Sequence, residues 1–130
     1  MLIITNLTKQ KTPKIPWQKI ANDILGKKYD LSVVLAGNKL MRKLNNRYRK
    51  KDRSATVLSF PLSKKEAPRL RSGQGEIFIN LSQKKHPLLY LYIHGLLHLK
   101  SFKHSAKMEI IENKLMKKFN KYEGGNHNRP

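Results

Sequence analysis

The segment Leu88–Leu99 constrains this chain more than any other, because its twelve residues are almost wholly apolar. The two exceptions within it are His94 and His98. A helix that is apolar nearly all round is buried, so this segment predicts a central helix around which the rest of the fold is built. Pro87 directly precedes it, and proline is favoured where a helix begins. Two imidazoles on a buried helix need hydrogen bonds or a metal ion, because an unsatisfied buried polar group costs free energy.

The remainder of the chain predicts short strands and amphipathic helices in one domain. Apolar and β-branched runs predict strands at 2–5, 31–36, 56–60 and 76–79. Apolar residues at helical spacing predict further helices at about 17–28, 40–49 and 106–121. Pro61 is expected to stop its strand, and the charged stretch 63–75 is expected to be a flexible loop. The domain is expected over residues 1–123, with a flexible tail at 124–130.

Composition narrows the class of protein. The chain has 130 residues and no cysteine, so no disulfide can form and any metal ion must be held by nitrogen and oxygen ligands. No basic start followed by a long apolar run indicates a signal peptide. No stretch approaches the roughly 18 apolar residues of a membrane span. We therefore expect a cytoplasmic protein without membrane contact.

Charge indicates the partner. Lys and Arg number 28 against 8 acidic residues, which gives a formal net charge of +20. So large an excess on a small domain favours a polyanionic partner, with nucleic acid as the first candidate. The alternative is a lysine-rich surface that reflects compositional bias and only solvates the protein.

Three histidines form a candidate metal site. His94 and His98 are four residues apart, so on a helix they lie one turn apart on the same face. His104 follows six residues later, far enough for the chain to leave the helix and bring back a third imidazole. Three neutral imidazoles leave a coordination position open on a metal ion, which is typical of catalytic zinc-type sites. The alternative is a set of structural histidines.

The same spacing occurs in metzincin proteases, so peptide hydrolysis must be considered. Those enzymes have a glutamate immediately after the first histidine, as general base for the metal-bound water. Here that position is Gly95. Without a base on the helix, and with a net charge that suits phosphates, the sequence favours a phosphodiester substrate over a peptide.

Three blocks of sequence resemble one known family. The run 94–104 closely resembles H-G-x-L-H-L-x-G-Y-D-H, the signature of the YbeY-type endoribonucleases. Residues 44–52 followed by 57–61 are similar to that family's L-N-x-x-Y-R-x-K-D and V-L-S-F-P, and residues 75–79 are similar to its G-D-I-x-I strand. The histidine block is the most specific of the three.

The resemblance implies a compact α+β domain, which we expect as a small mixed β-sheet of about four strands packed by four to five helices. It implies one divalent metal ion, usually taken as zinc, held by His94, His98 and His104. It implies metal-dependent cleavage of single-stranded RNA, in ribosomal RNA maturation and ribosome quality control, with ribosomal RNA or the ribosome as partner. It also implies that Arg49 is the functionally important arginine, and a guanidinium there would grip two phosphate oxygens.

Some positions depart from the family pattern. Ser101-Phe102-Lys103 replaces Gly-Tyr-Asp, and Ser54-Ala55-Thr56 replaces Pro-Thr-Asp/Asn. Lys103 puts a cation where the family has an anion, which would weaken metal affinity if it lies near the ion. The alternative function is therefore a non-catalytic RNA-binding or ribosome-binding protein on the same fold with a weakened metal site.

Other residues near these blocks have alternative roles. Tyr48 or Phe102 would stack a nucleobase, although helical spacing favours Tyr48 as a core residue. Asp52 and Glu76 are the nearest acid/base candidates, and a structural cap or salt bridge is favoured for each. His86 and His127 are interpreted as surface residues.

Overall fold

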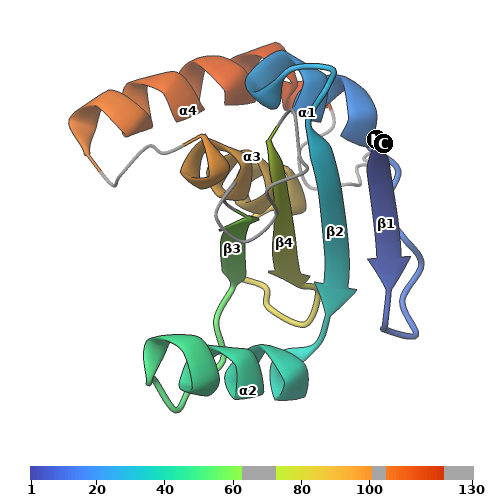
Figure 1. Ribbon diagram of the computed structural model, residues 1–130, viewed down its shortest axis with the longest axis vertical. Helices are drawn as coiled ribbons and strands as arrows, with labels where there is room; N and C mark the ends of the chain where they lie inside the picture. Colours follow the sequence, from blue (N-terminus) through green and yellow to red (C-terminus); the bar gives the residue numbers. More distant parts are fainter. Residues whose placement is uncertain (63–72, 101–104, 122–130) are drawn as a thin grey trace.

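The computed structural model of the chain describes residues 1–62, 73–100 and 105–121. Its strands form one four-stranded mixed sheet in the order β1-β2-β4-β3 (Figure 1). The strand bounds are β1 (Leu2–Asn6), β2 (Asp30–Ala36), β3 (Val57–Leu62) and β4 (Gln74–Asn80). β1 pairs parallel to β2 and β2 pairs parallel to β4, whereas β3 runs antiparallel to β4 at the edge.

Four helices accompany the sheet in the described ranges. They are α1 (Trp17–Leu25), α2 (Asn38–Arg49), α3 (Leu88–Leu99) and α4 (Ala106–Lys118). α3 packs on β3 and β4 and contacts both α1 and α4. α2 lies apart from them, at the end of the sheet toward which β2 and β4 point (Figure 1). The expected single α+β domain with a small mixed sheet is confirmed.

The central helix is buried as its sequence predicts. Eight of the 12 residues of α3 are buried, Gly95 among them, and the bounds of α3 coincide with the predicted segment. The Tyr92 hydroxyl donates a 2.8 Å hydrogen bond to the Trp17 carbonyl oxygen and so fixes α3 to the start of α1. Each fully buried aliphatic side chain contributes about 1.5–3 kcal/mol relative to exposure, so this helix supplies much of the hydrophobic stabilisation.

Gly95 allows α3 to lie close to the sheet. A Cβ atom at this position would lie 3.1 Å from both Ile77 Cγ2 and Ser59 Oγ. Ser59 Oγ donates a 3.0 Å hydrogen bond to the Gly95 carbonyl oxygen. The close approach brings the helix face that carries His94 and His98 next to β3.

α2 is attached to the opposite face of the sheet by a smaller cluster of Ala36, Met41 and Leu58. The buried Asn80 side chain strengthens this attachment. Its amide donates to Asn38 Oδ1 at 2.7 Å, and also to the hydroxyl of Ser54 and the carbonyl of Ala55. The start of α2 and the segment before β3 are therefore fixed to the end of β4.

Several predicted bounds were wrong. α1 ends at Leu25 because Gly26 adopts a φ of +93°, which stops the helix. Pro61 does not stop β3, since an edge strand tolerates a proline. β4 begins at Gln74, inside the stretch expected to be a loop.

The predicted flexible tail, 124–130, and most of the predicted flexible loop, 63–75, lie outside the described residues. In the part of the chain that the structure describes, no helix combines the length and apolarity that a membrane span requires.

Candidate functional site

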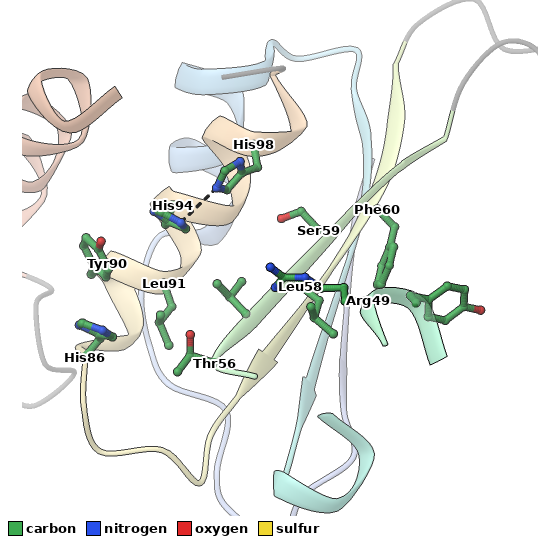
Figure 2. Close-up of a pocket in the computed structure, with 12 residues that line it drawn as sticks. Arg49, Thr56, Leu58, Ser59, Phe60, His86, Tyr90, Leu91, His94 and His98 are labelled. Carbon is green, nitrogen blue, oxygen red and sulfur yellow. Dashed lines mark hydrogen bonds between the residues drawn. The ribbon is translucent and has the colours of Figure 1, made fainter. Parts of the chain in front are cut away.

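A cleft of about 640 Å³ lies between α3, β3 and the end of α2. Figure 2 shows His94 and His98 on one wall, on α3, with the Arg49 side chain directed toward α3 from the end of α2. The cleft thus brings together the two described histidines of the predicted metal site and the arginine that the family resemblance implied, although Arg49 lies 45 positions before His94 in the chain.

The two imidazoles converge through one nitrogen each. His94 Nε2 and His98 Nε2 are 3.1 Å apart, and the ring centroids are 4.6 Å apart (Figure 2). Two imidazole ligands on a tetrahedral zinc ion, each about 2.0–2.1 Å from the metal, would have nitrogens about 3.3 Å apart. The observed separation is that of a hydrogen bond between the two rings, and it is also close to the spacing of two ligands on one ion.

A carboxylate contacts the ring nitrogen of His94 that does not face His98. His94 Nδ1 contacts Glu112 Oε2, and the Glu112 residue is only 5% exposed. A carboxylate on the outer nitrogen of a metal-ligating histidine is the usual arrangement, because it orients the ring and fixes the tautomer. This arrangement leaves His94 Nε2, the atom that faces His98, to ligate.

Glu112 was missed by the sequence reasoning, yet the sequence carried a signal for it. The residue lies within the apolar stripe of α4, four residues after the buried Met108 and seven before the buried Phe119. A single carboxylate on the buried face of an amphipathic helix needs a partner, because an unpaired buried charge is costly. That partner is His94.

These residues fit a divalent metal ion, although the set is incomplete in the described ranges. Within 1–62, 73–100 and 105–121 no three His, Asp or Glu side chains come together to hold an ion. The predicted third ligand, His104, lies outside the described residues. The fit to a metal ion rests on the converging Nε2 atoms of His94 and His98 and on the Glu112 carboxylate at the other nitrogen of His94.

Arg49 is the last residue of α2 and is exposed at the cleft. Lys50 ends the helix in a left-handed conformation, with a φ of 56°. The buried Asn45 amide donates a 2.9 Å hydrogen bond to the Arg53 carbonyl oxygen and so holds the turn that follows. The solvent face of α2 is basic, since Arg42, Lys43 and Arg47 are all exposed.

The prediction that Tyr48 is a core residue was wrong. Tyr48 is 56% exposed and lines the cleft beside Arg49. Its ring packs edge-on against Phe60, with centroids 5.2 Å apart, and the Arg47 guanidinium lies 5.4 Å from its centroid. α2 reaches the sheet mainly through its first turns, so helical spacing alone did not bury its last turn. Phe102 lies outside the described residues.

The two carboxylates near the family blocks have structural partners. Asp52 pairs with Arg42 at 2.8 Å, an exposed contact that lowers the pKa of Asp52 and raises that of Arg42. Glu76 Oε2 accepts a 3.1 Å hydrogen bond from the Ser32 hydroxyl. Both partners agree with the structural roles that the sequence favoured.

Three neighbouring rings, those of His86, Tyr90 and His94, form a row along the side of the cleft made by α3. The exposed His86 packs at a tilt against Tyr90 with ring centroids 5.0 Å apart, and Tyr90 packs at a tilt against His94 with centroids 5.6 Å apart. Burial raises the pKa of the Tyr90 phenol, and the carboxylates of Glu112 and Glu109 raise it further. His86 is a surface residue as predicted, and it lines the cleft. His127 lies outside the described ranges.

Comparisons with known proteins agree on one family. The family described as "Endoribonuclease YbeY" matches residues 3–122. A curated "Endoribonuclease YbeY" from Ehrlichia canis is 38% identical over 104 residues, covering 68% of this chain and 66% of the relative. Another with that name, from Pelagibacter ubique, is 36% identical over 110 residues, covering 73% and 72%. The chain thus spans just under two thirds of the length of the Ehrlichia canis relative.

A solved structure supports the fold. The solution structure of a Thermotoga maritima protein aligns with a TM-score of 0.58 at 21% identity, covering 99% of this chain and 98% of that one. At this level of identity the likeness concerns the arrangement of helices and strands.

Proposed function

This chain belongs to the endoribonuclease YbeY family, and we propose that it is a metal-dependent endoribonuclease that cleaves single-stranded RNA. We propose further that it acts in the cytoplasm on ribosomal RNA or the ribosome, in ribosomal RNA maturation and ribosome quality control. One observation supports the chemistry most directly. Two imidazole Nε2 atoms converge to 3.1 Å in the same cleft that Arg49 lines.

The histidines supply the metal-binding part of the proposal. His94 and His98 would hold the ion, with zinc as the first candidate and His104 as the further ligand. A divalent ion held by neutral imidazoles keeps its full 2+ charge, which acidifies bound water and neutralises a phosphate oxygen. The close approach allowed by Gly95 holds the helix that carries the first two ligands against β3.

Arg49 supplies the fixed positive charge on the other side of the cleft. A guanidinium is planar and can bond two phosphate oxygens at once. In this position it orients the phosphodiester and stabilises the negative charge that develops during cleavage. No proton needs to leave or reach Arg49 in this role.

The neighbouring surface suits a single strand of RNA. The exposed cations of α2 attract the phosphate backbone, and the exposed ring of Tyr48 offers a face for an unstacked base. Because base stacking contributes roughly 1–3 kcal/mol per base and needs no sequence match, the surface favours unpaired RNA over a duplex.

The test uses metal-loaded protein and an unstructured RNA oligonucleotide labelled at one end. Cleavage is expected with zinc, and it is expected to stop after chelation and in the variant His98→Ala. Lys27→Ala, which removes an exposed charge beyond α1, is the matched control and is expected to cleave normally. Cleavage that survives both chelator and His98→Ala would contradict the proposed site.

The same experiment separates the alternative function. A protein that holds no metal and binds RNA equally well before and after His98→Ala would instead be a non-catalytic RNA-binding or ribosome-binding protein. Metal analysis of the purified protein, with about one equivalent of zinc expected per chain, gives the first answer.

A further inference from the structure

We propose that Glu112 is a positioning residue that holds His94 in the tautomer and orientation in which Nε2 can ligate a metal ion. This inference rests on the proposed function for its purpose, but its geometry stands on contacts between described residues. It makes α4 part of the site, although no residue of α4 was singled out from the sequence for a chemical role.

The first step is the contact itself. Glu112 Oε2 meets His94 Nδ1 between two packed helices, α4 and α3. An ionised carboxylate only accepts hydrogen bonds, so the hydrogen in this contact belongs to Nδ1 of the histidine. With Nδ1 protonated in a neutral ring, Nε2 carries the lone pair.

The second step is the direction of that lone pair. His94 Nε2 lies 3.1 Å from His98 Nε2, so the nitrogen of His94 that carries the lone pair faces the other candidate ligand (Figure 2). Without Glu112, the acceptor that keeps the proton on Nδ1 is lost, so both tautomers of the neutral ring become accessible. Glu112 therefore selects the one state in which His94 is ready to bind a metal.

The third step is the cost of burying a carboxylate. The side chain of Glu112 is 6% exposed and that of His94 is 14% exposed. Desolvating a carboxylate costs free energy, and one hydrogen bond from a neutral imidazole offsets only part of that cost. A role in stability alone does not explain a carboxylate here, whereas a role in orienting His94 does.

The experiment begins with metal-free protein, in which long-range ¹H–¹⁵N NMR distinguishes the two tautomers of His94. The wild type is expected to show Nδ1–H and an unprotonated Nε2. Glu112→Leu is expected to lose this single state and give mixed tautomers. Glu112→Gln keeps an acceptor and the side-chain volume, so it is expected to retain the tautomer. Glu109→Gln, on the exposed side of α4, is the matched control.

The second readout is the dissociation constant for zinc, measured by competition with a chromogenic chelator. Loss of a carboxylate behind a ligating histidine typically weakens metal affinity 10- to 100-fold. That loss is expected for Glu112→Leu, a smaller loss for Glu112→Gln, and none for Glu109→Gln. Far-UV circular dichroism of each metal-free variant reports whether α4 still packs in a folded protein.

The outcomes separate this inference from the proposed function. A wild-type His94 that carries its proton on Nε2 overturns the inference, and that measurement holds even if Glu112→Leu fails to fold. Unchanged tautomer and zinc affinity in a folded Glu112→Leu also overturns it. A wild type with the expected tautomer that binds no metal contradicts the proposed function and leaves the action of Glu112 on His94 in place.

Discussion

The role of each residue in the cleft depends on which of its atoms faces a neighbouring side chain. His94 uses its two ring nitrogens differently, with Nδ1 toward Glu112 and Nε2 toward His98. Arg49 lines the same cleft from the end of α2, and Gly95 keeps the helix of the histidines close to Ser59. Each residue contributes one defined property, so single substitutions separate their roles.

Arg49→Ala tests the guanidinium. The rate of RNA cleavage is expected to fall roughly 10²- to 10³-fold, the usual cost of removing one group that stabilises developing charge. Arg49→Lys keeps the charge but loses the two-point contact, so it is expected to restore only part of the rate. Single-turnover cleavage with saturating protein measures the effect, with Lys27→Ala as control. A wild-type rate in Arg49→Ala would exclude a direct role.

Among the elements, α4 sets where Glu112 lies, and α4 packs directly against α3. Ser105 caps its start, since its hydroxyl accepts a 3.2 Å hydrogen bond from the Met108 backbone N–H. Met108 and Phe119 are buried on its inner face. Near its end, the Lys118 ammonium donates to Asp23 Oδ2 of α1 at 2.8 Å. The Ser105 cap defines where the helix begins, and the pair between Lys118 and Asp23 joins its end to α1.

The pair between Lys118 and Asp23 predicts a dependence on pH. The hydrogen bond from Lys118 lowers the pKa of Asp23 below its ordinary value of 3.8. A depressed pKa stabilises the folded state above pH 3.8, and this contribution disappears as the pH falls through the folded-state pKa. Asp23→Asn is expected to lose less than about 1 kcal/mol at neutral pH.

Urea unfolding measures this prediction. The wild type and Asp23→Asn are compared at neutral pH and well below the ordinary pKa of Asp23. The difference in unfolding free energy is expected to shrink at the lower pH, because both side chains are then uncharged. A difference that stays constant between the two conditions would exclude the ion pair as its source.

At the scale of the whole molecule, the site joins elements that are distant in the chain. α3 lies on one face of the sheet, α2 is attached through the opposite face, and β3 lies along the cleft between them. A metal ion held by His94 and His98 would bind the folded state more tightly than the unfolded chain, because the two Nε2 atoms are held at one spacing only in the folded domain.

Zinc is accordingly expected to raise the stability of the whole domain. At a free concentration 100 times the dissociation constant, the gain is about 2.7 kcal/mol by mass action. Thermal unfolding of the protein with zinc, and after chelation, measures the gain. His98→Ala is expected to lose most of it, while Lys27→Ala is expected to retain it. Equal midpoints with and without zinc in the wild type would contradict binding to the folded state.

Much of this fold was predictable because the signals are local. Alternation and helical spacing placed all four strands and all four helices of the described ranges, with errors only at their ends. One of those errors has a local cause, and another depends on the position of a strand in the sheet. Gly26 stops α1 through its positive φ, and Pro61 is tolerated because β3 turned out to be an edge strand.

The candidate site likewise contains residues that the sequence predicted and residues whose places depend on how the helices pack. A spacing of four residues puts His94 and His98 on one helix face whatever the surroundings, so their pairing followed from the order of residues along the chain. Glu112 meets His94 across 18 residues of chain, and Tyr48 is exposed at the cleft, only because of how α4 and α2 pack. Helical periodicity describes one helix at a time, whereas the neighbours of a side chain depend on which helix faces lie against each other.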